Sequence, residues 1–156
     1  MKYLCDQMLG TLAKWLRIFG LDTFYANSEM DDSELIEISK KEKRVLITRD
    51  KNLLQKAKKE KIGVIEINTT DIDEQIKKVL NQEKVDKKKV LSRCILCNSD
   101  LDEVEKVEIE KKVPKRVFES NEKFWLCPKC KKVYWKGTHY ENMIEKIKSF
   151  YSKTAS

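Results

Sequence analysis

The first 83 or so residues alternate between short apolar runs and amphipathic segments, and this alternation constrains the fold more than any other feature. We expect strands at residues 2–5, 21–26, 44–48 and 64–67, with a helical stripe of apolar residues after each of them. Strands that alternate with helices in this way form a parallel sheet through right-handed crossovers. The sequence therefore predicts an α/β fold in which helices sandwich a parallel sheet.

An aspartate lies at or near the carboxyl end of two of these expected strands. Asp6 follows the first strand, and Asp50 ends the stretch RVLITRD that contains the third. Ligands of parallel sheets bind beyond the carboxyl ends of the strands. Two carboxylates about 4 Å apart repel by roughly 4 kcal/mol at an effective dielectric constant near 20, so a bound cation would relieve them. The alternative is that each aspartate only caps the helix that follows it.

Two CxxC pairs lie in the second half of the chain, at Cys94–Cys97 and Cys127–Cys130. Two such pairs on separate hairpins can bring four thiolates to one tetrahedral zinc ion. A pair of redox dithiols is the weaker interpretation, because neither pair follows a strand in a βαβ unit. We expect a zinc ribbon whose folding depends on the metal, and we expect Cys5 to be an ordinary buried residue.

The net charge of +7 favours an anionic partner such as nucleic acid. The most basic stretch lies within the expected ribbon, where residues 111–136 hold nine Lys or Arg against two Glu. Aromatic residues are interleaved with these cations, a pattern typical of a single-stranded RNA surface; they are Phe118, Phe124, Trp125, Tyr134 and Trp135. For Trp125 and Tyr134 we favour the alternative that they form the ribbon's own core. His139 is expected to have a structural role.

The chain divides into three expected parts, which are a sheet domain at 1–85, a zinc ribbon at 90–138 and a C-terminal helix at 139–152. Within the ribbon, Val104, Val107 and Ile109 look strand-like. No apolar run approaches about 18 residues, and no signal peptide is recognisable. We therefore expect no membrane association and a cytoplasmic location. Nothing in the sequence indicates an oligomeric state.

Four stretches resemble one small family. They are LCDQMLGTLAKWLRIFG, DSELIEISKKEKRVLITRD, the RCxxCN segment at 93–98, and CPKCKKVYWKGTHY. In this order they are similar to the PIN-like ribonuclease domain with an appended zinc ribbon, which is also found at the carboxyl end of mutator-type exonucleases. The resemblance covers roughly residues 3–145. It implies a metal-dependent ribonuclease with a Rossmann-like sheet and a cluster of acids at its carboxyl edge.

Carried over by position, the resemblance makes Asp6, Asp32 and Asp50 the catalytic acids, with Asp31 as a close rival of Asp32. This sequence departs from the family pattern in one respect. Many PIN domains carry a further acid on a helix of the segment after the first strand, and here no residue clearly replaces it. The candidates are Glu29, Asp31, Glu34 and Asp71. The resemblance therefore leaves open whether one or two metals bind.

The expected function is that of a Mg²⁺- or Mn²⁺-dependent ribonuclease that acts on RNA, most simply single-stranded RNA. Basic residues near the acids and on the ribbon are expected to contact the RNA; they are Lys14, Arg17, Arg49, Lys131 and Lys132. Lys14 and Arg17 could instead form only the solvated side of their helix. The main alternative function is RNA binding without catalysis, in which the acids are caps or a residual site.

Overall fold

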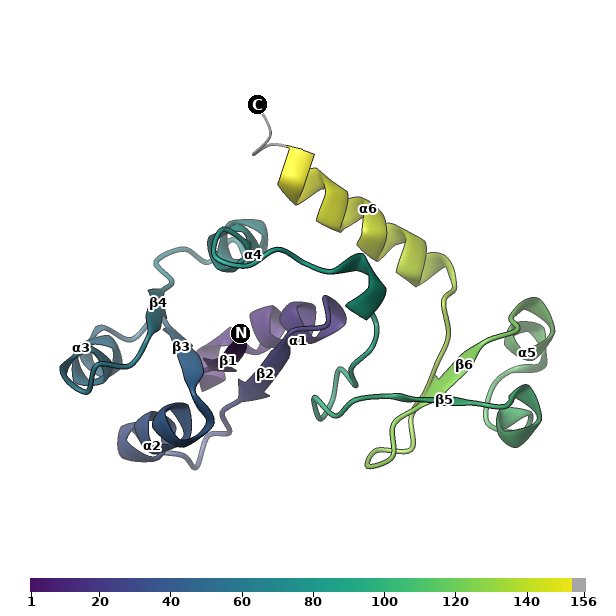
Figure 1. The fold of residues 1–156 in the computed structure, drawn as a ribbon, viewed down its shortest axis with the longest axis horizontal. Helices are drawn as coiled ribbons and strands as arrows, with labels where there is room; N and C mark the ends of the chain where they lie inside the picture. Colours follow the sequence, from purple (N-terminus) through teal and green to yellow (C-terminus); the bar gives the residue numbers. More distant parts are fainter. Residues whose placement is uncertain (153–156) are drawn as a thin grey trace.

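A computed structural model describes residues 1–152 of the chain (Figure 1). Its first part is a four-stranded sheet with the order β2-β1-β3-β4, in which every neighbouring pair is parallel. The strands are β1 (Lys2–Cys5), β2 (Asp22–Tyr25), β3 (Arg44–Thr48) and β4 (Val64–Glu66). The predicted α/β class and the parallel sheet are confirmed.

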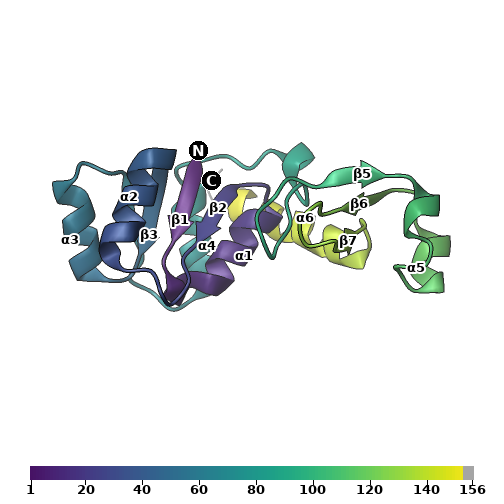
Figure 2. The same cartoon turned by 90° about the horizontal axis from the view of Figure 1, so that it is seen from below.

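Helices cover both faces of this sheet, because side chains of successive strand residues point to opposite faces. Tyr3, Cys5 and Ile47 pack in one core, which includes residues of α1 and α4. Leu4 and Leu46 pack in the other core, against α2 and α3. The helices are α1 (Gly10–Ile18), preceded by the 3-10 turn η1 (Gln7–Leu9), and α2 (Asp32–Glu42), α3 (Lys51–Lys59) and α4 (Ile72–Leu80). Figure 2 shows α2 and α3 on one side of the strands and α1 and α4 on the other.

The second part is a three-stranded antiparallel sheet with the order β5-β6-β7. Its strands are β5 (Asp102–Val104), β6 (Phe124–Leu126) and β7 (Val133–Tyr134), and the short helices around it are η2 (Lys87–Lys89), η3 (Lys106–Ile109) and α5 (Lys115–Ser120). One local prediction was wrong. Val107 and Ile109 lie in η3 and not in a strand, because Glu105 and Glu108 form a capping box that begins a helical turn.

The last helix, α6 (Thr138–Ser152), leaves the ribbon and returns over the sheet domain (Figure 1). Ile147 and Phe150 are buried in the same core as α1 and α4. The Lys146 ammonium lies 2.9 Å from a carboxylate oxygen of Asp73 in α4. The predicted C-terminal helix is thus present, and it connects the ribbon to the core of the sheet domain.

The ribbon also contacts β2, which is an edge strand of the parallel sheet. The Thr23 N–H donates to Asn98 Oδ1 (2.9 Å), and Asn98 Nδ2 donates to Asp22 Oδ1 (2.7 Å). Asn98 follows the first CxxC pair and has a φ of 70°, in the left-handed region that asparagine tolerates better than most residues. The first cysteine pair is therefore held directly against the sheet.

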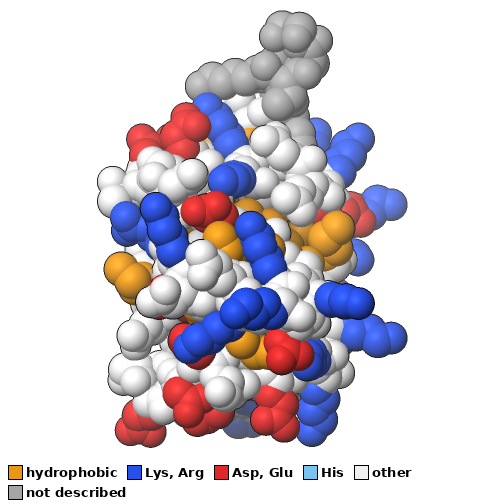
Figure 3. Space-filling view, turned by 90° about the vertical axis from the view of Figure 1, so that its left-hand side faces the viewer, with side chains coloured by type: hydrophobic (Ala, Val, Ile, Leu, Met, Phe, Trp, Pro, Cys, Tyr) orange, Lys and Arg blue, Asp and Glu red, His pale blue; other side chains and the backbone are white. Residues whose placement is uncertain are grey.

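The surface is densely charged. Figure 3 shows the side of the molecule that carries α3, where Lys and Arg side chains alternate with Asp and Glu and hydrophobic side chains surface only in small areas. Among residues 1–152, no helix has both the length and the apolar composition that a membrane crossing requires.

Candidate active site and metal centre

Asp6 lies at the carboxyl end of β1, beside the carboxyl end of β3. Cys5 is opposite Ile47 in the parallel register, so Asp6 comes next to Thr48. The Thr48 hydroxyl donates to Asp6 Oδ2, and the Met8 N–H donates to Asp6 Oδ1 (3.0 Å). The side chain of Asp6 is buried. Its orientation is therefore fixed by a neighbouring strand as well as by its own turn.

Asp50 lies two residues beyond the end of β3. Its Oδ1 accepts hydrogen bonds from the N–H groups of Asn52 (2.8 Å) and Leu53 (3.3 Å), so Asp50 caps α3. Its own N–H donates to the Thr48 hydroxyl oxygen (3.0 Å). Thr48 therefore joins the Asp6 carboxylate to the backbone of Asp50. Asp50 is exposed, so capping α3 does not prevent its carboxylate from meeting a ligand.

Asp32 is the first residue of α2, and Asp31 is the cap of that helix. Asp31 Oδ1 accepts the Glu34 N–H (2.9 Å). The Asp32 carboxylate is not the cap of α2, and it lies 3.1 Å from the Lys56 ammonium of α3. Asp31 and Asp32 thus differ in what they contact, although they are adjacent in the sequence.

The three aspartates line one small cavity of about 80 Å³. Its other lining residues are Gln7, Met8, Ala26, Asn27, Met30, Leu35 and Leu53. Asp31 is not among them. The structure therefore brings Asp6, Asp32 and Asp50 together from three separate elements. Their oxygens are nevertheless not mutually close, since within the described part of the chain only the cysteine cluster gathers three or more such ligand atoms within 4.8 Å.

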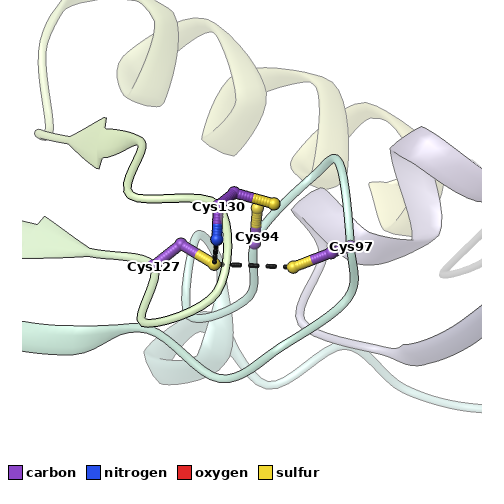
Figure 4. A group of neighbouring side chains, drawn as sticks. All are labelled: Cys94, Cys97, Cys127 and Cys130. Carbon is purple, nitrogen blue, oxygen red and sulfur yellow. Dashed lines mark hydrogen bonds between the residues drawn. The ribbon is translucent and has the colours of Figure 1, made fainter.

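The four cysteines of the two CxxC pairs form that cluster, with all four Sγ atoms within 4.8 Å of one another (Figure 4). Both pairs have the same backbone turn. The N–H after the second cysteine donates to the carbonyl of the first, from Asn98 to Cys94 and from Lys131 to Cys127, at 2.9 Å in each case. Asn98 and Lys131 also share a positive φ. Two equivalent turns thus present two thiols each, as a tetrahedral zinc site requires.

The protonation of the thiols fits a cation-binding cluster. Burial raises the pKa of the Cys97 thiol, but hydrogen bonds with Ser99, Cys130 and Cys127 outweigh this effect and bring that pKa to about 6. The hydrogen bond with Cys97 raises the pKa of Cys130 to about 12. One ionised thiol therefore makes ionisation of a second unfavourable unless a cation is present. Zinc would hold all four as thiolates.

Cys5 lies outside this cluster and is fully buried in the sheet. Burial, with the neighbouring Asp6 charge, raises the pKa of its thiol well above the ordinary value. The expectation that Cys5 is an inert core residue agrees with this position.

Of the residues expected to contact RNA, Arg17 is placed where it cannot. Its side chain is buried, and its guanidinium donates to the carbonyl oxygens of Thr23 and Ile95, each at 2.9 Å. Arg17 therefore holds the first cysteine turn against β2, and this position is incompatible with the predicted RNA contact. Lys14, Lys131 and Lys132 are exposed, and Arg49 is half-buried beside Asp50.

Thr48 and Lys56 are two residues of the candidate site that sequence reasoning missed. Thr48 is the first residue of the TRD triplet, and its position two residues before Asp50 was a usable signal. Lys56 lies in the middle of a lysine-rich helix, where nothing distinguishes it from its neighbours. Its pairing with Asp32 becomes visible only once α2 and α3 are placed side by side.

A parallel sheet covered by helices on both faces, followed by four clustered cysteines that could hold a metal ion, defines an α/β domain with an appended metal-binding ribbon. The family model described as "Mut7-C RNAse domain" matches residues 1–147, so the chain belongs to the Mut7-C RNase domain family. The predicted resemblance is thereby confirmed. The family links the chain to RNA as a substrate. Comparison with curated proteins gives no significant match, and comparison with solved structures gives none either.

Proposed function

We propose that the protein is a ribonuclease that cleaves RNA phosphodiesters with Mg²⁺ or Mn²⁺ held by Asp6, Asp32 and Asp50, while the zinc ribbon assists RNA binding. The observation that carries this proposal is that the three carboxylates, from three separate elements, line one cavity in a chain that belongs to an RNase domain family. Asp31 is left out of the proposed set, because it does not line the cavity.

The donor set suits a hard divalent cation, because Mg²⁺ and Mn²⁺ prefer carboxylate oxygens and water. If bound there, such an ion would supply activation of a water and stabilisation of the leaving oxygen. The chain's own residues prepare the site. Thr48 and the Met8 N–H orient Asp6, while the α3 cap orients Asp50.

Lys56 is proposed to act as an exchangeable counterion of Asp32. The Lys56 side chain is 58% exposed and the Asp32 side chain is 34% exposed. An ion pair with this much solvent around it is worth about 0–1 kcal/mol. A divalent cation can therefore displace Lys56 from Asp32 at little cost, and Lys56 is then available to an RNA phosphate. We propose that Arg49 and Lys14 also contact RNA phosphates.

The test is cleavage of single-stranded RNA by the purified, zinc-loaded protein in Mg²⁺ or Mn²⁺. Asp6→Asn and Asp50→Asn should each lower cleavage by about 100-fold or more, as expected for groups that hold the catalytic ion. Asn remains a good helix cap, so Asp50→Asn should stay folded. Equal activity in the variants would show that a contaminant cleaves the RNA and would contradict the proposal.

Asp71 offers a matched control for Asp50. It caps α4 through the N–H groups of Asp73 (2.9 Å) and Glu74 (3.1 Å), the same two contacts that Asp50 makes in α3. It does not line the cavity. Asp71→Asn should therefore keep full activity, which separates the loss of a metal ligand from the loss of a cap.

RNA binding without catalysis is the second candidate function, and two observations favour it. Both oxygens of Asp6 accept hydrogen bonds from the protein, and the three carboxylates do not converge as closely as the four thiols do. This function predicts RNA affinity that falls with added salt and no cleavage with any divalent ion. That pair of results would replace the ribonuclease proposal.

A further inference from the structure

A second cavity lies where β7, the connector before the first cysteine pair and the start of α6 meet. Its volume is about 200 Å³, and its walls are largely aromatic and aliphatic, with Tyr134, Trp135, Leu91, Ile95 and Met143 among them. Pockets for drug-sized ligands measure about 300–1,000 Å³. A cavity of this size therefore fits one flat ring system rather than a larger ligand.

One wall of the cavity is held rigidly. The Ile95 N–H donates to Tyr134 Oη (3.0 Å), which also lies 3.2 Å from Cys94 Sγ. The Tyr134 ring is thereby fixed between the metal centre and the connector. A pre-formed aromatic wall lowers the ordering cost of binding a ring against it.

Trp135 forms a second wall and remains partly exposed. Gly137 permits its position. A Cβ at residue 137 would lie 3.2 Å from Trp135 Nε1 and 3.3 Å from Cδ1, closer than most Cβ contacts. The glycine thus lets the indole lie close to the backbone while part of its surface stays available for stacking.

The charges around the cavity identify its occupant. Residues 127–140 contain four lysines and no acid, and Lys132 lines the cavity itself. Among the described residues that line the cavity, Lys132 is a cation and none is an acid. An aromatic cavity with such a lining complements a flat base attached to phosphates. It offers no carboxylate to balance the cations if an apolar side chain of a protein were bound there.

We propose that this cavity holds an unpaired base of single-stranded RNA, stacked on Trp135, with Lys131 and Lys132 contacting the adjacent phosphates. The inference deepens the proposed function, since it names how the ribbon would hold the substrate. It concerns binding alone and does not require that the aspartates cleave RNA.

The test measures binding of a short single-stranded RNA to the zinc-loaded full chain by fluorescence anisotropy, in an Asp50→Asn background that prevents cleavage. Trp135→Ala should weaken binding about 5- to 100-fold, as expected for loss of one stacked base. Trp135→Tyr keeps an aromatic face and should retain most of the affinity. Lys132→Gln should weaken binding and lower the slope of log affinity against log salt by about one.

Val107 supplies the control. It is an apolar residue of the ribbon that is 74% exposed, and it does not line the cavity. Val107→Ala should keep its affinity within about twofold. The zinc content and unfolding midpoint of each variant must match those of the parent protein, so that weakened binding cannot be attributed to a misfolded ribbon.

An oligonucleotide of the same length without bases separates stacking from phosphate contacts. The parent and Trp135→Ala should bind it equally. Equal loss with both oligonucleotides, or RNA affinity unchanged by Trp135→Ala, would overturn the proposal; in the second case the cavity would be left for an apolar side chain of a protein partner. Absence of cleavage by the protein with Asp50 intact would contradict the proposed ribonuclease function. It would not affect the proposal that the cavity binds an RNA base.

Discussion

The sheet domain and the ribbon solve the same problem, which is burial of a core, by different means. The sheet buries apolar side chains on both faces, and its two cores contain residues from every helix around it. In the ribbon, the buried cluster around the metal centre consists of Cys94, Cys127 and Tyr134. The first region can be stabilised by the hydrophobic effect. For the second, we expect that a metal ion bound by the four thiols holds the turns together.

Removal of the metal should have the largest effect and should separate the two regions. Cys127→Ser, or a strong chelator, should unfold the ribbon, because structural zinc contributes about 10–16 kcal/mol to the folding of comparable small modules. Amide exchange measured by mass spectrometry should show lost protection in β6 and β7 and retained protection in β1 and β3. Equal loss in all four strands would mean that the two regions fold as one unit.

A substitution in the sheet core should destabilise the sheet domain and leave the ribbon's metal site intact. Leu46 is fully buried between α2, α3 and the strands, so Leu46→Ala should lower the free energy of unfolding by about 2–5 kcal/mol. The control Val107→Ala, at a residue that is 74% exposed in η3, should change it by less than about 0.5 kcal/mol. Urea unfolding measures both, and loss of bound zinc from Leu46→Ala would contradict the separation of the regions.

The smallest effect is expected at the contact between the regions. Partial burial disfavours the charged form of Asp22, but hydrogen bonds from Asn98 and Arg44 outweigh it, so the Asp22 pKa lies below its usual range. The stability that this carboxylate contributes is therefore fully present above the unfolded-state pKa near 3.9 and is lost as the pH falls through the folded-state value. Asp22→Asn should cost about 1–3 kcal/mol at pH 7.

The pH dependence sharpens this last prediction. The difference in unfolding free energy between the original protein and Asp22→Asn should shrink below about pH 4. Asp100→Asn serves as the control, because Asp100 also faces Arg93 (3.5 Å) but its side chain is 81% exposed, so little change is expected. A difference for Asp22→Asn that stayed constant from pH 7 to pH 3 would show that its charge does not stabilise the contact.

The features that could be predicted from the sequence are those that depend on local patterns of residues. The alternation of apolar runs identified the strands and helices of the sheet, and the spacing of Cys94, Cys97, Cys127 and Cys130 identified the metal centre. The acids Asp6 and Asp50 were placed at one edge because parallel strands end together. Each of these inferences uses residues that are close in the sequence or are related by a repeating period.

Interactions between distant segments could not be predicted in this way. Arg17 was expected to contact RNA, but it donates to the carbonyl oxygen of Ile95. Ile95 lies 78 positions away in the sequence, so no local pattern indicated this partner. Arg44 begins β3, yet it is buried and paired with Asp22 across β1. Val107 and Ile109 have strand-forming side chains, but the capping box of Glu105 and Glu108 decides their backbone. In each case a specific polar partner outweighed the periodicity.

The contact of Asn98 with Thr23 has a consequence for how copies of the chain meet. Strand β2 pairs only with β1, so its other side presents backbone groups to which a further strand could add. The first cysteine turn occupies part of that side through the side chain of Asn98. We therefore predict that removal of a metal from the four thiols exposes this side of β2 to intermolecular β-pairing, so that metal-starved protein self-associates in a concentration-dependent manner.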